Sequence, residues 1–85
     1  MYEVYLERSA ENDIKRLPAS AFHRILPQIK SLAENPRPSG CRKITGSKTD
    51  WRIRVGDYRV IYEIDEKANA VRVMRVRHRR EAYRR

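Results

Sequence analysis

The alternating segment at residues 51–64, WRIRVGDYRVIYEI, most constrains how this chain can fold. Two runs of alternating apolar and polar side chains flank Gly56-Asp57, a pair typical of a two-residue hairpin turn. With that turn, three apolar pairs face one another: Val55 with Tyr58, Ile53 with Val60, and Trp51 with Tyr62. The sequence therefore predicts a β-hairpin with one apolar face, which should pack against helices.

Helices are predicted in the first half of the chain. Residues 2–6 alternate as a half-buried strand, and Ser9 is a suitable N-cap for a short helix over residues 10–17. Pro18 interrupts that helix, and a second one should run to about residue 34. Its apolar stripe comprises Phe22, Ile25, Leu26, Ile29, Leu32 and Ala33. Pro27 lies within the stripe, and we expect one bent helix rather than two separate helices.

A further strand is predicted over residues 71–76, and residues 79–85 should form a short helix or a tail. The order of elements is then β-α-α-β-β-β. We expect one α+β domain over residues 1–85, with a mostly antiparallel four-stranded sheet and two helices packed on one face.

Charge points to the kind of partner. The 85 residues carry a net charge of +9, and residues 42–85 hold 14 basic against 6 acidic side chains. Arginine supplies 15 of the 20 basic residues, and its planar guanidinium suits bidentate contact with phosphate or carboxylate. The partner is therefore expected to be a polyanion, either a nucleic acid or an acidic protein.

Other classes of protein are disfavoured. A chain of 85 residues has no room for a separate cofactor domain, and Cys41, the single cysteine, can form neither an internal disulfide nor a cysteine-based metal site. No apolar run reaches the length of a membrane span, and the N-terminus does not resemble a signal peptide. We expect a cytosolic protein with no cofactor, no metal and no membrane contact.

The polar face of the hairpin carries the first candidate site. The predicted pairing places Arg52, Arg54 and Arg59 together, with Arg54 directly opposite Arg59. Like charges that face each other across a strand pair are destabilising. The arginines are then either a solvated basic face or a cradle that binds a phosphate group. Further along, Glu63 and Arg72 are predicted to form a cross-strand ion pair.

The C-terminal stretch VRHRREAYRR adds three candidates. His78 is either a surface residue or a proton-transfer group, since histidine titrates near neutral pH. Arg79 would give another phosphate contact if the chain folds back over the sheet. Tyr83 is either an apolar anchor for the tail or a platform on which a base stacks.

The chemistry available to such residues is narrow. The sequence has no paired carboxylates at catalytic spacing, no serine–histidine–aspartate order and no metal-ligand cluster. One reaction suits arginine, histidine and tyrosine. In RNA the ribose 2′-OH can attack the adjacent phosphate, and a protein need only align it, stabilise the extra negative charge and move two protons.

The order of elements, the segment KITGSKTDWRIRVGDYRVIYEI and the ending RVRHRREAY resemble the RelE/ParE toxin superfamily, on the RelE side, over essentially the whole chain. The resemblance implies a toxin of a type II toxin–antitoxin module. RelE-like members bind in the ribosomal A site and cut mRNA by 2′-OH attack, leaving a 2′,3′-cyclic phosphate. A RelB-like antitoxin, which we expect to be acidic, neutralises the toxin, and the pair represses its own operon by binding operator DNA.

The resemblance also implies site residues. Arg52 and Arg54 match two basic positions of the family's second strand, and Arg59 matches the arginine after the hairpin. Arg79 and Tyr83 match the family's C-terminal arginine and tyrosine. The best-known bacterial members carry lysines at the first two positions, and arginine is a poor general base. His78 is then the candidate base, as in relatives with a histidine near this point.

Two other functions share these features. A ParE-like toxin has the same fold but poisons DNA gyrase and cuts nothing. A non-catalytic nucleic-acid-binding module would also carry a charge of +9. The placement of the arginines and the C-terminal tyrosine favours the endonuclease.

Overall fold

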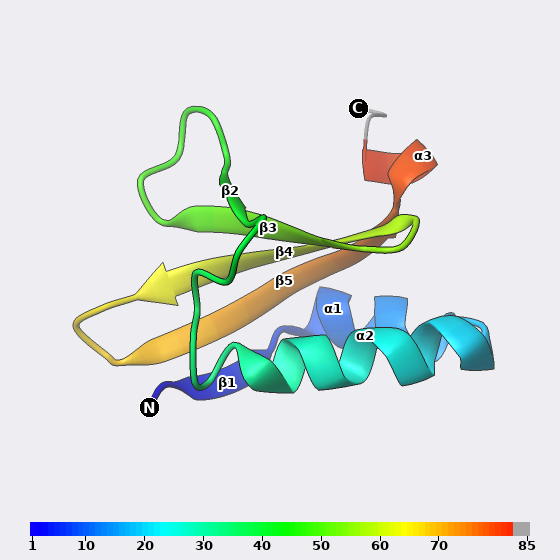
Figure 1. Cartoon of the computed structure of the whole chain (residues 1–85), viewed down its shortest axis with the longest axis horizontal. Coiled ribbons are helices and arrows are strands. Elements are labelled where there is room, and N and C mark those ends of the chain that lie inside the picture. The colour runs from blue at the N-terminus through cyan, green and yellow to red at the C-terminus, as the bar shows by residue number, and fades with distance from the viewer. Residues whose placement is uncertain (83–85) are drawn as a thin grey trace.

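The hairpin lies inside a five-stranded sheet in the computed structural model, which describes residues 1–82 (Figure 1). The strands are β1 (Glu3–Leu6), β2 (Arg42–Lys43), β3 (Asp50–Val55), β4 (Tyr58–Asp65) and β5 (Ala70–His78). The helices are α1 (Arg8–Lys15), α2 (Ala19–Ser31) and the short α3 (Arg79–Ala82). The strands lie in the order β1-β5-β4-β3-β2, and only β1 and β5 run parallel.

The predicted α+β architecture is confirmed, with one more strand than expected. The additional strand is β2, whose two residues pair with Arg52 and Trp51 of β3. A two-residue strand is too short to show alternation, so no pattern of side chains predicts it. In Figure 1, α1 and α2 lie together below β3 and β4, and α3 lies above these strands beside the turn that joins them.

The register of the hairpin agrees with the prediction. All three apolar pairs are aligned as expected, and Arg54 is aligned with Arg59. Gly56 begins the turn with a φ of 60°, a left-handed backbone conformation that glycine adopts without steric cost. The turn therefore fixes which face of β3 and β4 is apolar.

The core lies between that face and the helices. Ile25, Ile29 and Leu32 of the predicted stripe are buried against the sheet, where Val60 and Tyr62 are fully buried. The other members of the predicted stripe are half-buried. One continuous helix contains Pro27, as expected, although it ends at Ser31 rather than near residue 34.

The predicted N-cap of the first helix is wrong. The helix begins at Arg8, and Glu7 occupies the cap position without a side-chain hydrogen bond. Ser9 lies within the first turn, and its hydroxyl donates a 2.7 Å hydrogen bond to the carbonyl of Met74 in β5. Capping preferences are local, and here a contact with a distant strand uses the hydroxyl instead.

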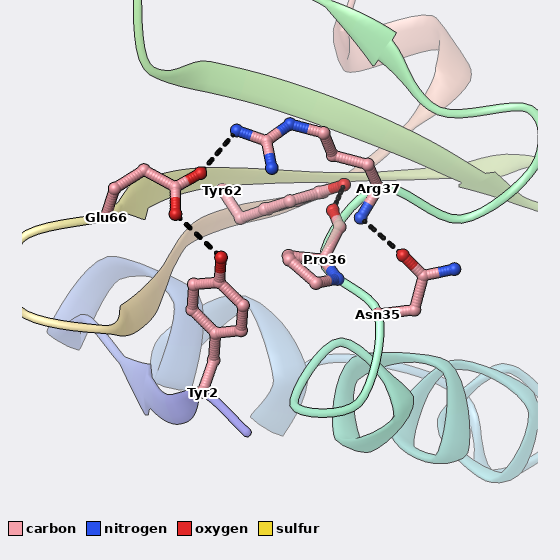
Figure 2. A network of polar contacts seen from close by, with 6 residues as sticks. All are labelled: Tyr2, Asn35, Pro36, Arg37, Tyr62 and Glu66. Atoms are coloured by element: carbon pink, nitrogen blue, oxygen red, sulfur yellow. Dashed lines mark hydrogen bonds and ion pairs between the residues drawn. The ribbon is translucent and has the colours of Figure 1, made fainter.

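A polar network joins three distant segments at the end of the sheet where β4 turns into β5 (Figure 2). Glu66, in the turn after β4, accepts 2.7 Å hydrogen bonds from the Tyr2 hydroxyl and the Arg37 guanidinium. The same guanidinium lies 5.2 Å from the centre of the Trp51 ring. The buried Tyr62 hydroxyl donates to the carbonyl of Pro36 at 2.7 Å. These contacts fix the loop between α2 and β2 against the sheet.

Candidate basic site

Three arginines line up across three adjacent strands on the face of the sheet opposite to the core. Arg54 of β3 is paired with Arg59 of β4, which is paired in turn with Arg77 of β5. These three residues are called the arginine row below. They alternate along their strands with Ile53, Val60 and Val76, which are buried in the core, so their side chains leave the sheet on the other face.

The members of the row differ in burial. Arg54 is exposed, whereas Arg59 is only 4% exposed and makes polar interactions in the folded chain. The short helix α3 contacts β4, the strand that carries Arg59. A buried guanidinium must keep its hydrogen bonds, because an unpaired buried charge is costly. Arg59 is therefore a fixed part of the fold, while Arg54 presents its charge to solvent.

Arg52 belongs to a neighbouring basic pocket rather than to the row itself. It is half-buried, and its strand partners are Arg42 of β2 and Ile61 of β4. Arg42, Arg52 and Arg54 line a pocket of about 360 Å³ beside the loop that precedes β2. Arg42, which the sequence analysis did not single out, brings a third guanidinium to this end of the face.

Arg77 joins the row because β5 contains a bulge. The register of β4 and β5 shifts between Ile61 and Tyr62, so Met74 has no partner on β4. Without the shift, the alternation that buries Val71 and Val73 would turn Arg77 towards the core. The core residue is Val76 instead, and Arg77 stands on the arginine face. The run AVRVMRVRH reveals the shift only as a break in its alternation.

Two side chains of α1 hold the bulge in place. The Ser9 hydroxyl bonds the Met74 carbonyl, and the Asp13 carboxylate accepts a 2.9 Å hydrogen bond from the backbone N–H of Val76. Asp13 also accepts from the Arg75 guanidinium at 3.0 and 3.2 Å. Residues four apart share one face of a helix, which is why Ser9 and Asp13 reach the same stretch of β5.

His78 lies on the other side of the sheet. Its strand partner is Tyr58, and the two rings meet edge to face with centroids 5.2 Å apart. Tyr58 packs against the core. The structure therefore does not bring His78 together with Arg54 and Arg59. Its Nδ1 atom accepts a 3.3 Å hydrogen bond from the backbone N–H of Arg80.

The C-terminal candidates are placed in part. Arg79 begins α3, and its backbone N–H donates to the carbonyl of Asp57 at 2.6 Å, next to the pairing of Tyr58 with His78; its predicted phosphate contact stays a prediction. Arg79 is exposed beside the hairpin turn. Tyr83 lies outside the described residues, so its predicted role stays a prediction.

The predicted cross-strand ion pair is confirmed. Arg72 faces Glu63 across the strands, and 3.6 Å separates its guanidinium from the Glu63 carboxylate. The same guanidinium lies 3.0 Å from the carboxylate of Asp65. The pKa of Asp65 lies below its usual value because the backbone N–H of Ala68 and the Arg72 guanidinium both donate hydrogen bonds to it. This cluster is structural, and its carboxylates offset the basic charge at that end of the sheet.

The described part of the chain holds neither a metal-ligand cluster nor a helix that could span a membrane. No group of three histidine, cysteine, aspartate or glutamate side chains gathers there in a way that could hold a metal ion. No helix within residues 1–82 is long and apolar enough to cross a membrane.

Comparison with known sequences identifies a family. Residues 4–83 match the family model described as the ParE toxin of the type II toxin–antitoxin system parDE. A curated relative, the candidate toxin RelE1 of Methanocaldococcus jannaschii, is 26% identical, and the match covers 96% of this chain and 94% of the relative.

Solved structures share the fold. The archaeal RelE–RelB complex from Pyrococcus horikoshii contains a chain that is 26% identical, with a TM-score of 0.80, over 92% of this chain and 94% of that one. The RelB–RelE complex from Methanococcus jannaschii gives 25% identity and a TM-score of 0.77, over 93% and 94%. The isolated Escherichia coli RelE toxin, at 19% identity, gives a TM-score of 0.81 over 92% and 84%, and shows the fold alone.

Proposed function

Because this chain belongs to the ParE toxin family of type II toxin–antitoxin systems and is RelE-like in sequence and fold, we propose that it is a ribosome-dependent endonuclease that cuts mRNA in the ribosomal A site. The observation that carries the proposal is the arginine row. The exposed Arg54 and the half-buried Arg77 form a basic surface suited to phosphate groups, and the buried Arg59 lies between them on the middle strand.

The reaction needs only the RNA and side chains that bind phosphate and move protons. The ribose 2′-OH attacks the adjacent phosphorus, the bond from phosphorus to the 5′-oxygen breaks, and a 2′,3′-cyclic phosphate remains. One proton leaves the 2′-OH and another reaches the departing 5′-oxygen. The exposed Arg54 and half-buried Arg52 stabilise the charge that builds up on the phosphate, and Arg79 extends the surface past the hairpin turn. Arg59 holds the centre of the row.

His78 is the proposed proton-transfer group, and the fold sets a condition on that role. Because His78 lies on the core side of the sheet, RNA bound to the arginine row must pass around the end of β5 to meet it. Its Nδ1 atom already accepts a hydrogen bond from Arg80, which favours the tautomer with the proton on Nε2. The lone pair of Nδ1 is then held in that hydrogen bond, so His78 can act as the proposed base for the 2′-OH only if the bond to Arg80 breaks when RNA binds.

A cognate antitoxin is the proposed protein partner, since related toxins have been solved as RelE–RelB complexes. The surplus charge of residues 42–85 calls for an acidic antitoxin segment. Such a segment would cover the arginine row and so block RNA. Ribosome, mRNA and, for the toxin–antitoxin complex, operator DNA complete the proposed set of partners.

A second function has one observation in its favour. The family model that matches this chain is described as the ParE toxin of the parDE system, and a ParE-like chain would poison DNA gyrase without cutting RNA. The arginine row and the exposed Arg79 favour the endonuclease, because gyrase poisoning requires no phosphate-binding face. A non-catalytic nucleic-acid-binding module is the third possibility.

A translation extract separates the three. Arrest of translation with fragments of mRNA would support the endonuclease. Gyrase-dependent DNA breaks with intact mRNA would replace it by the ParE-like activity, and neither effect would leave the binding module.

A further inference from the structure

A second basic pocket lies at the open edge of β5. Strand β1 covers this edge only as far as the pairing of Leu6 with Val73, and beyond it the described chain places no strand on that side of residues 74–78. A pocket of about 420 Å³ opens there between β5 and the end of α1. Its walls include Asp13, Arg16, Tyr58, Arg75, Arg77 and His78. The volume falls in the range of about 300–1,000 Å³ that is usual for small-ligand sites.

The charge of this pocket is strongly positive, with three arginines against one carboxylate. That carboxylate, of Asp13, already accepts three hydrogen bonds, two from Arg75 and one from the backbone of Val76. Asp13 and Arg75 therefore compensate each other. Within residues 1–80, neither Arg16 nor Arg77 forms an ion pair. Two uncompensated guanidinium groups beside a concave surface favour a phosphate group.

One wall of the pocket is aromatic. Tyr58 and His78 meet at an interplanar angle of 83°, and both rings line the pocket. Unpaired RNA bases stack on such rings, whereas a free inorganic anion gains nothing from them. A ligand that combines a phosphate with a flat heterocycle uses both features.

We propose that this pocket binds one nucleotide of single-stranded RNA, with its phosphate held by Arg16 and Arg77 and its base against Tyr58 and His78. The choice of RNA as the ligand rests on the proposed function. Arg77 belongs to both the arginine row and the pocket. An RNA strand that leaves the row would then pass around the open edge of β5 into the pocket, which brings it to the side of the sheet where His78 lies.

The test is a titration of the isotope-labelled full chain, followed by the NMR signals of its backbone amides. The probes are adenosine 5′-monophosphate, adenosine and inorganic phosphate. We expect the monophosphate to shift the amide signals of residues 16–17 and 75–78, and to bind at least about tenfold more tightly than either fragment. Arg16→Ala should weaken its binding by about tenfold or more, because it removes a charge-assisted hydrogen bond.

Lys15→Ala is the matched control, since it removes the same charge from the neighbouring, exposed residue outside the pocket. Equal losses in the two variants would overturn the proposal, because a diffuse field rather than a site would then hold the ligand. Absence of binding by the wild type at millimolar concentration would also overturn it, as would phosphate binding as tightly as the nucleotide. The titration uses no ribosomes, so it can succeed or fail independently of mRNA cleavage.

Discussion

Replacing Arg54 by alanine should separate the stability of the protein from its activity. Arg54 is exposed and faces Arg59 across the hairpin, so its removal relieves a like-charge contact. Such cross-strand contacts are worth about 0.2–1 kcal/mol, and the free energy of unfolding should stay equal or rise by a few tenths of a kcal/mol. The same change removes a guanidinium from the scissile phosphate, which should lower the rate of mRNA cleavage by about 10²–10³-fold.

Arg59→Ala should behave differently because Arg59 is only 4% exposed. Its truncation breaks buried polar interactions, and we expect the free energy of unfolding to fall by about 1–3 kcal/mol. In a domain of this size, that corresponds to a fall in Tm of at least about 4 °C. Activity and stability should then be lost together, whereas the hairpin register by itself gives the two arginines equivalent positions. Burial of one partner, which the hairpin register does not reveal, makes the difference.

The measurements are thermal melting and cleavage of mRNA on ribosomes, with the same purified variants. Arg54→Lys keeps the charge without the bidentate fork and should give an intermediate rate. Arg8→Ala removes an exposed arginine from the start of α1, far along the chain from the row, and should change neither quantity. The reasoning is refuted if Arg54→Ala unfolds the domain, or if it cleaves at the normal rate.

Four further changes test other parts of the structure. Asp13→Ala leaves the Val76 N–H and the Arg75 guanidinium without their acceptor, so the free energy of unfolding measured by urea titration should fall by about 1–3 kcal/mol. Glu11→Ala, at an exposed position of the same helix, is the control, and an equal loss in the two variants would contradict the role of Asp13 at the bulge. Hydrogen bonds from Tyr2 and Arg37 hold the pKa of Glu66 below its ordinary value of 4.5. The ionised Glu66 carboxylate therefore stabilises the fold above pH 4.5, and this contribution is lost as the pH falls through the lowered pKa of the folded state. The difference in Tm between wild type and Glu66→Gln should shrink below about pH 4.5, and a constant difference would count against the network. His78→Ala should slow cleavage by about 10²–10⁴-fold and remove one limb of the pH–rate profile, and an unchanged profile would assign proton transfer to another group. An acidic antitoxin should bind more tightly at low salt, since charges are screened over about 10 Å at 0.1 M, and an affinity that ignores salt would exclude an electrostatic interface.

The sequence predicted the hairpin well because the turn and the alternation give the same register. Gly56 permits a tight turn, and the two strands beside it have opposite, matching faces. The turn and the alternation together determine which side of β3 and β4 faces the core and align Arg54 with Arg59. Local signals of this kind agree with one another throughout the hairpin of β3 and β4.

The features that the sequence did not reveal depend on contacts between distant residues. Ser9 is a good N-cap by type, but Met74, 65 residues away, accepts its hydrogen bond. The bulge at Met74 reverses the alternation of β5, which places Arg77 on the arginine face and His78 on the core side. A strand pattern read with a strict period of two cannot locate such a shift. His78 would share the face of the hairpin arginines only if β5 had no bulge.

The central claim is that this chain cuts mRNA on the ribosome through a phosphate-binding row of arginines. The most direct measurement incubates the purified chain with programmed ribosomes and a defined mRNA, and maps the new RNA ends and their chemistry. We expect cuts within the A-site codon, fragments that end in a 2′,3′-cyclic phosphate, and a rate about 10²–10³-fold lower for Arg54→Ala. Intact mRNA at saturating wild-type protein would contradict the account. So would upstream fragments that end in free 2′- and 3′-hydroxyl groups together with downstream fragments that begin with a 5′-phosphate.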